Sequence, residues 1–220
     1  MSLDLDQKQR WLREFELNGF VVLRGIVPRT WVRNTYEQLM PVIREMIDSR
    51  VEDAEHPDRL SLDLDERPDL SEGPLGDDRY FRRCEVVEEL VEQVFGGEYW
   101  RNVRSNLECV FDGSEWHTDQ TLDETPDPNR QERTIRLTYN VPLVDFTWAN
   151  GAMEILPGTH RLRRSFGSFD DLVNIYPHRL NLQRGDGVLR DGNCVHRATT
   201  NLTKRPRPML DRTYVMARGQ

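Results

Sequence analysis

The segment EWHTDQ places the imidazole of His117 two residues before the carboxylate of Asp119. Side chains two residues apart on an extended strand point to the same face, so both groups could reach one point in space. This arrangement is typical of part of a metal site. Such pairs also arise by chance in a chain rich in aspartate, so the pair alone is weak evidence and a site needs further ligands.

His196 is the candidate for the third ligand. It lies in a predicted late strand after the turn at residues 185–187, and a jelly roll can bring strands so distant in sequence side by side. Two histidines and one carboxylate form a facial triad, which leaves the other positions of Fe(II) open for oxygen chemistry. We therefore predict a metal site formed by His117, Asp119 and His196.

Arg207 follows His196 by eleven residues. A planar guanidinium deep in a barrel is suited to bind a carboxylate of a co-substrate through two parallel hydrogen bonds. The surrounding run KRPRP is equally typical of a solvent-exposed basic surface. The residue types alone do not choose between these two interpretations.

The elements that must position these residues follow from the apolar periodicity. Helical spacing predicts helices over residues 6–17, from 28–30 to 47, and over 86–95. Short alternating runs between turn residues predict strands elsewhere. These strands cover residues 20–23, 103–111, 134–144, 152–156, 179–182, 188–190, 194–199 and 212–216.

This order of elements predicts a mostly β fold with flanking helices. An N-terminal helical layer before many short strands is typical of a double-stranded β-helix, the jelly roll of cupin-like proteins. We expect one domain over residues 1–220. It would hold N-terminal helices and a first strand over 1–48, an acidic loop or lid over 49–80, and the jelly-roll core over 101–217.

The acidic segment stands out by its charge. Residues 48–78 carry twelve acidic side chains against three arginines, a net charge of -9. Prolines and glycines interrupt this stretch, which predicts a long irregular loop or lid. It could be an ordinary solvated surface, or a lid that favours a cationic substrate.

Composition excludes several classes of partner. The chain has 38 acidic and 30 basic residues, a net charge of -8, which is the opposite of what a phosphate backbone attracts. We therefore expect a small-molecule substrate and no nucleic acid. No apolar run is long enough for a membrane span, and the first residues lack the pattern of a secretory leader, so we expect no membrane partner and a cytoplasmic location.

Four phrases occur in order along the chain: FELNGFVVLRGIVP, WHTDQ, NGAMEILPGTHR and GDGVLRDGNCVHRATTNLTKRPR. Together they resemble the phytanoyl-CoA dioxygenase family of Fe(II)/2-oxoglutarate-dependent oxygenases. The resemblance implies that His117, Asp119 and His196 hold Fe(II) and that Arg207 binds the far carboxylate of 2-oxoglutarate. It also implies a reaction with O2 that yields succinate and CO2 and hydroxylates a small metabolite, or oxidises a C–H bond in a related way, with natural-product biosynthesis as one setting.

One position departs from the family pattern. Many members carry a small hydroxyl residue two positions after the distal histidine, where this chain has Ala198. Thr199 or Thr200 could instead donate a hydrogen bond to 2-oxoglutarate, and Asn106 could line the pocket. Related halogenating enzymes lack the carboxylate, so the presence of Asp119 favours hydroxylation, although desaturation, epoxidation and ring formation stay open.

Two other functions stay open from the residues alone. A metal-dependent hydrolase could use two histidines and one aspartate, but it gives Arg207 no role and usually needs a nearby general base. A non-catalytic cupin-like module could bind a metal or ligand without turnover, although it would not need all four residues intact. The sequence specifies neither the substrate nor the oligomeric state.

Overall fold

The computed structural model describes residues 4–48, 59–96, 100–119, 134–162, 172, 175–203 and 205–216. Three helices come early in the chain: α1 (Leu5–Asn18), α2 (Arg29–Asp48) and α3 (Glu85–Val94). The α1 helix begins where the carboxylate of Asp4 accepts a hydrogen bond from the Asp6 N–H, and it ends at Gly19 in the left-handed conformation. All three helices lie where the apolar periodicity predicts them.

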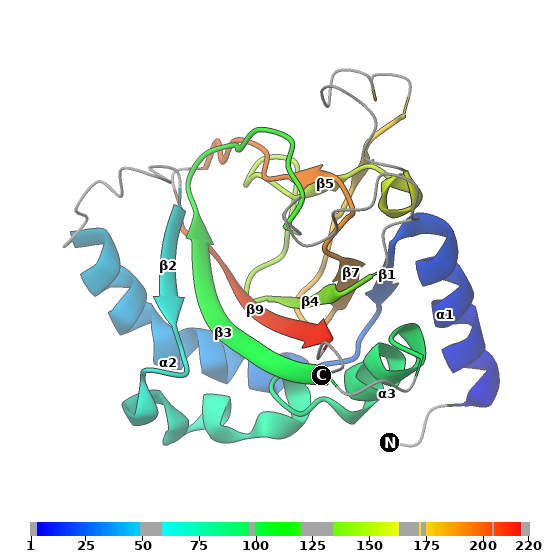
Figure 1. Ribbon diagram of the computed structural model, residues 1–220. Helices are drawn as coiled ribbons and strands as arrows, with labels where there is room; N and C mark the ends of the chain where they lie inside the picture. Colours follow the sequence, from blue (N-terminus) through cyan, green and yellow to red (C-terminus); the bar gives the residue numbers. More distant parts are fainter. Residues whose placement is uncertain are drawn as a thin grey trace.

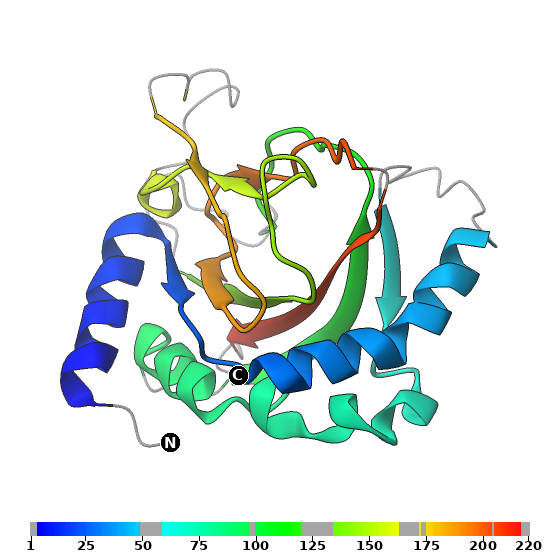
Figure 2. The same ribbon diagram turned by 180° about the vertical axis from the view of Figure 1, so that it is seen from behind.

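Within the described residues, nine strands form two antiparallel sheets. The large sheet has the order β1-β7-β4-β9-β3-β2 and the small sheet has the order β6-β5-β8. In chain order the strands are β1 (Phe20–Leu23), β2 (Arg59–Asp63), β3 (Trp100–Val110), β4 (Arg136–Pro142), β5 (Glu154–Ile155), β6 (His178–Arg179), β7 (Gly187–Asp191), β8 (His196–Arg197) and β9 (Arg207–Met216). Figures 1 and 2 show the large sheet as a curved wall, with the small sheet facing its hollow side.

The helices cover the outer face of the large sheet (Figures 1 and 2). Alternate strand residues, such as Leu107 on β3, Tyr139 on β4 and Leu210 on β9, point outwards and pack with buried residues of α1, α2 and α3 in the main hydrophobic core. Burying this face fixes the register of each strand, since a slip by one residue would turn its apolar set inwards. A smaller core, with Phe146, lies between the two sheets.

The opposite, inner face of the large sheet is polar. Asn106 and Glu108 on β3, Asp211 and Thr213 on β9, and Thr138 on β4 line a cavity on this side. The alternation therefore sends apolar side chains outwards to the helices and polar side chains inwards. A polar interior between two sheets indicates a binding site, because buried polar groups need partners.

Residues 59–78 differ from the irregular loop or lid that their composition suggests. Here β2 pairs with β3, and three short 3-10 helices follow, at Pro68–Ser71, Pro74–Gly76 and Asp78–Tyr80. Leu64, Leu70 and Leu75 are buried in the main core. The expectation was wrong for this part because leucines spaced among the carboxylates anchor the segment, and overall charge hides them. Residues 49–58 of the expected lid lie outside the described residues.

The late strands also differ in extent from their expected ranges. Only residues 154–155 and 196–197 of two longer predicted strands pair regularly, whereas β9 begins at Arg207, five residues earlier than expected. Its partner strand β3 accounts for the extension, because Arg207 pairs with Val110 and Pro208 with Cys109. Within the described part of the chain, no helix is long and apolar enough to cross a bilayer.

The turn before β5 depends on a glycine. Gly151 has φ of +79°, and a Cβ atom added there would lie 2.3 Å from the carbonyl oxygen of Thr199. Gly25 has φ of +64° but open space around it. We expect Gly25→Ala to destabilise the fold by about 1 kcal/mol, the cost of the left-handed conformation alone. Gly151→Ala should cost about 2–4 kcal/mol because backbone overlap adds to that cost.

Chemical denaturation of the two variants checks this difference. Equal midpoints for Gly151→Ala and Gly25→Ala would contradict it.

Candidate metal centre and cavity

The structure brings His117, Asp119 and His196 together. One ligand atom from each of the three residues can be chosen so that all lie within 4.8 Å of one another. Two backbone hydrogen bonds join His117 to His196, of 3.0 Å from the His117 N–H and 2.9 Å from the His196 N–H. The N–H of Asp119 donates to the carbonyl of Gly192 at 2.9 Å, which aligns the whole 117–119 segment with β8 and the turn before it.

Each histidine is oriented by a carbonyl two residues earlier in the chain. Nδ1 of His117 lies 2.8 Å from the carbonyl oxygen of Glu115, and Nδ1 of His196 lies 3.0 Å from that of Cys194. A carbonyl oxygen only accepts hydrogen bonds, so Nδ1 carries the proton in both rings. Nε2 is therefore the ring nitrogen of each histidine that is available to bind a metal, while Nδ1 holds the orientation of the ring.

Charge at the site also suits a cation. Burial lowers the pKa of His196 to about 3, and the positive charge of Arg190 adds to this effect, so its imidazole is neutral at physiological pH. Burial alone would raise the pKa of Asp119, but the nearby cationic groups, of which Arg190 acts most strongly, together outweigh burial and hold the pKa well below its usual range. His196 thus presents a neutral nitrogen and Asp119 a carboxylate, and together with the imidazole of His117 they make the donor set of a non-haem iron site.

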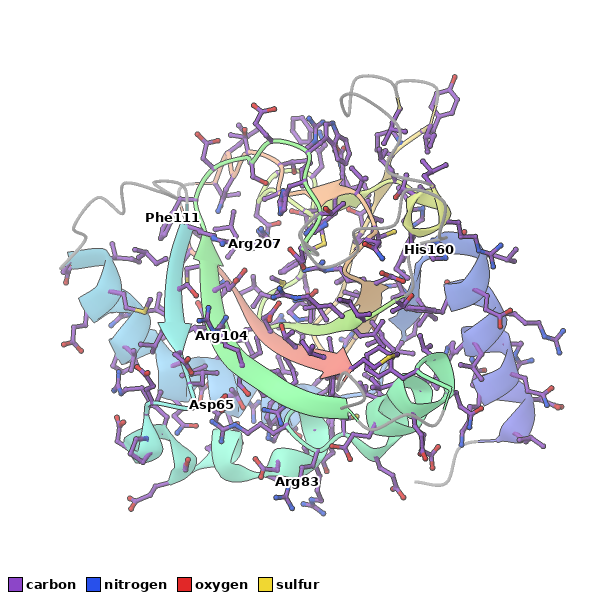
Figure 3. The ribbon with its side chains drawn as sticks, viewed as in Figure 1. Asp65, Arg83, Arg104, Phe111, His160 and Arg207 are labelled. Atoms are coloured by element: carbon purple, nitrogen blue, oxygen red, sulfur yellow. The ribbon has the colours of Figure 1, made fainter. Side chains whose placement is uncertain are left out.

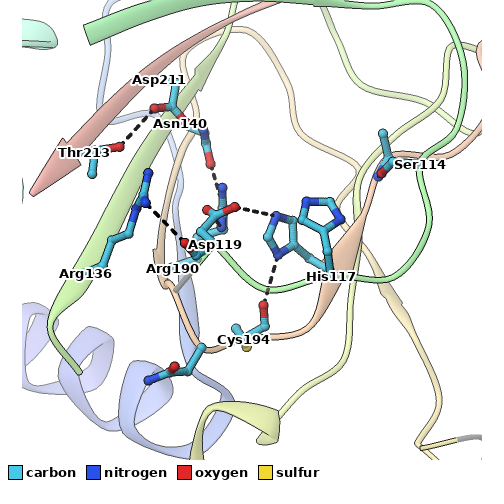
Figure 4. A network of polar contacts seen from close by, with 12 residues as sticks. Ser114, His117, Asp119, Arg136, Asn140, Arg190, Cys194, Asp211 and Thr213 are labelled. Carbon is cyan, nitrogen blue, oxygen red and sulfur yellow. Dashed lines mark hydrogen bonds and ion pairs between the residues drawn. The ribbon is translucent and has the colours of Figure 1, made fainter. Parts of the chain in front are cut away.

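Arg190 fixes which carboxylate oxygen is free. Its Nη1 donates to Oδ2 of Asp119 at 2.5 Å, while Oδ1 of Asp119 lies 3.6 Å from Nε2 of His196. Nε of Arg190 donates to Oδ1 of Asn140 at 3.1 Å, and Nδ2 of Asn140 donates to Oδ2 of Asp211 at 2.8 Å. Figure 4 shows this chain of contacts running from the metal-binding residues across the inner face of the large sheet.

A cavity of about 800 Å³ opens beside the three groups, and Arg207 lies in its wall. Arg207 is 1% exposed, and its Nε and Nη1 have no hydrogen-bond partner among the described residues. Burial lowers its pKa to about 10, so the guanidinium stays charged at neutral pH. The guanidinium carbon lies 4.4 Å from the centroid of the Phe146 ring, and this contact helps to orient the side chain. Figure 3 labels Arg207. A buried, unpaired cation beside a cavity is suited to bind a carboxylate.

The other candidates from the sequence have different positions. Asn106 lines the cavity. The hydroxyl of Thr199 donates to the carbonyl of Ala152 at 2.7 Å, and Thr199 is not among the cavity-lining residues. A hydroxyl does lie next to Ala198, on Ser114: its Oγ accepts a hydrogen bond of 3.0 Å from the Ala198 N–H, and Ser114 lines the cavity.

Sequence reasoning missed Arg190, Ser114, Thr138, Glu108 and Asp211. Two of these residues could have been noticed from the sequence, because each is a charged residue within a mostly apolar strand. Arg190 in GVLRD and Asp211 in MLDRTYVM are charged residues inside strands that are otherwise buried. A charge in such a strand is costly unless it has a partner or a function, so it marks a residue to examine for a polar contact. Ser114 carries no such signal, because its role depends on a neighbour far away in sequence.

His160 is not among the residues that line the cavity. It is 9% exposed, and its Nε2 donates to the carbonyl of Glu16 at 3.2 Å. Burial lowers its pKa to about 4. This histidine thus joins the PGTHR segment to the end of α1 (Figure 3).

Comparison with known proteins identifies the family. The family described as "Phytanoyl-CoA dioxygenase (PhyH)" matches residues 15–209. The chain belongs to the phytanoyl-CoA dioxygenase family. It is therefore a non-haem iron oxygenase that uses Fe(II), 2-oxoglutarate and O2. The donor set of two imidazoles and a carboxylate, together with the unpaired Arg207, fits both the metal and the dicarboxylate.

Solved structures share the fold of this phytanoyl-CoA dioxygenase family member. AviO1 from Streptomyces viridochromogenes Tue57 is 18% identical with a TM-score of 0.73, over 100% of this chain and 98% of AviO1. The epimerase SnoN, solved with Fe3+, alpha ketoglutarate and nogalamycin RO, is 18% identical with a TM-score of 0.70 over 97% and 85%. The carbocyclase SnoK from nogalamycin biosynthesis is 18% identical with a TM-score of 0.71 over 98% and 85%. These likenesses confirm the double-stranded β-helix.

Arg190 gives a prediction about metal affinity. Replacing it in Arg190→Met removes the group that orients Asp119, and loss of such a partner typically weakens metal binding about ten- to a hundredfold. Arg190→Lys keeps the charge and should lose less. Anaerobic Fe(II) titration followed by protein fluorescence measures the change.

Arg184→Met is the matched control, because the Arg184 side chain is 51% exposed and contacts Asp145 far from the metal ligands. Unchanged Fe(II) affinity in Arg190→Met would show that Asp119 needs no such partner.

Proposed function

We propose that this enzyme couples the oxidative decarboxylation of 2-oxoglutarate to hydroxylation, or a related C–H oxidation, of a small metabolite. The observation that carries the proposal is the presence in one cavity of the His117–Asp119–His196 cluster and of the buried, unpaired Arg207. A metal hydrolase would need the cluster but would leave Arg207 without a role. A binding module would not need both.

Each residue has a role in this proposal. His117 and His196 would bind Fe(II) through Nε2 and Asp119 through Oδ1, while Arg207 would pair with the far carboxylate of 2-oxoglutarate. When both are bound, they supply the chemistry by which O2 oxidises a substrate C–H bond and 2-oxoglutarate becomes succinate and CO2. The chain contributes geometry and charge: Arg190 holds Asp119 as a ligand through one oxygen, and the two sheets limit the access of water.

Ser114 takes the role that the sequence suggested for Thr199. The Ser114 hydroxyl oxygen accepts a hydrogen bond from the Ala198 N–H in the cavity wall. The Thr199 hydroxyl instead donates to the carbonyl of Ala152. We therefore assign to Ser114 the hydrogen bond to 2-oxoglutarate that the hydroxyl residue after the distal histidine supplies elsewhere in the family. Asn106 would line the substrate part of the cavity.

The type of oxidation and its setting are also part of the proposal. Asp119 supplies the carboxylate that halogenating relatives lack, which supports hydroxylation. SnoN is an epimerase and SnoK a carbocyclase, both from nogalamycin biosynthesis, so this fold supports several outcomes of C–H oxidation. A natural-product intermediate as the substrate and a cytoplasmic location agree with this setting.

The metal site is tested without knowledge of the substrate. We expect the wild-type protein, mixed anaerobically with Fe(II) and 2-oxoglutarate, to develop a weak visible charge-transfer band, and to release succinate slowly in air. His117→Ala and Asp119→Ala should lose both signals because each removes a metal ligand. His178→Ala, a change at an exposed histidine, should keep both. A band of normal intensity in either ligand variant would refute the triad.

Arg207 is tested by the requirement for 2-oxoglutarate. Arg207→Ala removes a charged hydrogen-bonding partner worth about 1.5–3 kcal/mol, so the 2-oxoglutarate concentration at half-maximal band intensity should rise about ten- to a hundredfold. Ser114→Ala removes a neutral partner and should raise it only a fewfold. An unchanged requirement in Arg207→Ala would remove Arg207 from the site.

A further inference from the structure

The cavity has a second polar region away from Arg207. Asp211 follows Arg207 by four residues on β9, roughly 13 Å along the strand. Around it lie Glu108 and Asn106 on β3, Thr213 on β9 and Thr138 on β4, all of which line the cavity. We call these five residues the acidic floor. The register places Asn106 opposite Asp211 and Thr138 opposite Thr213, so the floor is one continuous patch of the inner face.

Asp211 is a buried carboxylate without a cationic partner. It is 7% exposed, and it accepts hydrogen bonds from Nδ2 of Asn140 at 2.8 Å and from the hydroxyl of Thr213 at 3.4 Å. Among the described residues, none places a cationic nitrogen within 4.0 Å of it. Burial and then the nearby charge of Glu108 raise its pKa to about 7, against the opposing but weaker effect of the Arg190 charge. A cation in the cavity would relieve both effects.

Glu108 is only weakly compensated. Its Oε1 lies 3.9 Å from Nη1 of Arg59, whose side chain is 40% exposed, whereas the side chain of Glu108 is 15% exposed. An ion pair so long and so open to solvent contributes little. The charges of Arg207 and Arg190 also act on Glu108, but neither arginine forms an ion pair with it among the described residues, so the Glu108 carboxylate keeps room for a cationic ligand.

Thr138 gives an independent indication of a ligand. Its hydroxyl is buried without a hydrogen-bond partner among the described residues, and the residue is 1% exposed. An orphaned hydroxyl in a cavity wall is costly unless a ligand or water satisfies it. Because the hydroxyl oxygen can accept a hydrogen bond, it complements a donor group bound between β4 and β9.

Three further arginines of the cavity make contacts away from Asp211, although Nε of Arg136 has no hydrogen-bond partner among the described residues. Nη1 of Arg136 donates to the backbone carbonyl of Asp119 at 3.2 Å. Arg104 is 61% exposed and lies 3.8 Å from Asp63, at the rim (Figure 3). Arg190 is committed to Asp119 at 2.5 Å. None of the three forms an ion pair with Asp211, so the floor faces the open cavity as an acidic surface.

We propose that the substrate of this enzyme is a polar molecule carrying a protonated amine, which the carboxylates of Asp211 and Glu108 bind on the acidic floor with Thr138 accepting a further hydrogen bond. This inference rests on the proposed function, because it takes Arg207 and the metal centre to be occupied by 2-oxoglutarate and Fe(II). It adds that the rest of the cavity selects its substrate by positive charge.

Two series of matched probes test the charge preference. The first series has one sugar ring with three charges: cationic glucosamine, neutral N-acetylglucosamine and anionic glucuronate. The second series repeats the comparison on a short chain with aminobutanol, butanediol and hydroxybutyrate. Each probe is titrated at millimolar concentrations into the anaerobic Fe(II)–2-oxoglutarate enzyme, and the shift of the visible band measures binding. Saturation-transfer NMR on a Zn(II)-substituted sample gives a second measurement of binding.

We expect at least one amine to bind roughly tenfold or more tightly than its neutral and anionic counterparts. Asp211→Asn and Glu108→Gln, which keep the side-chain shape, should each remove that preference while the visible band stays intact. Asp112→Asn, which removes a charge from an exposed residue of the cavity rim, is the matched control and should retain the preference.

Two results overturn the inference: equal or tighter binding of a neutral or anionic probe, or no binding of either amine. If the visible band fails to form in the wild-type protein, the proposed function itself fails. If the band forms and the amine preference is absent, only the acidic floor is refuted.

Discussion

The site depends on two backbone hydrogen bonds that join His117 to His196. They align an extended segment that follows β3 with the short strand β8, and so they bring together ligands that lie far apart in the sequence. The two segments that these hydrogen bonds join belong to different sheets: β3, which precedes His117, is part of the large sheet, and β8 pairs with β5 in the small sheet. The candidate metal centre therefore lies where the two sheets meet, and its geometry is a property of the whole fold.

Electrostatics then organises the inner face around that centre. Arg190 pairs with Asp119 in the candidate metal cluster, and hydrogen bonds through Asn140 connect Arg190 to Asp211. Arg207 and Asp211 lie on the same strand and are both buried, yet neither forms an ion pair with a described residue. Burying a charge without a partner costs free energy unless a ligand complements it. The two charges have opposite signs, so we infer that each would bind a different molecule.

Much of this architecture could be predicted from the sequence. The helices and most strands follow from apolar periodicity, since it reflects which face each element buries. The histidines and Asp119 could be proposed from residue type and spacing, and the family resemblance pointed to Arg207. Composition misjudged residues 59–78, because three leucines outweigh many exposed carboxylates in deciding whether a segment packs. Ser114 could not be found, since a hydroxyl beside Ala198 arises only from the tertiary contact between two distant segments.

The leucine anchors of residues 59–78 have a consequence for how ligands enter. Swinging this segment outwards would pull Leu64, Leu70 and Leu75 from the core and break the pairing of β2 with β3, at a cost far above thermal energy. The β2 side of the cavity thus has the same conformation before and after a ligand binds. Discrimination there comes from preorganisation, and little conformational entropy is lost on that side when a molecule binds.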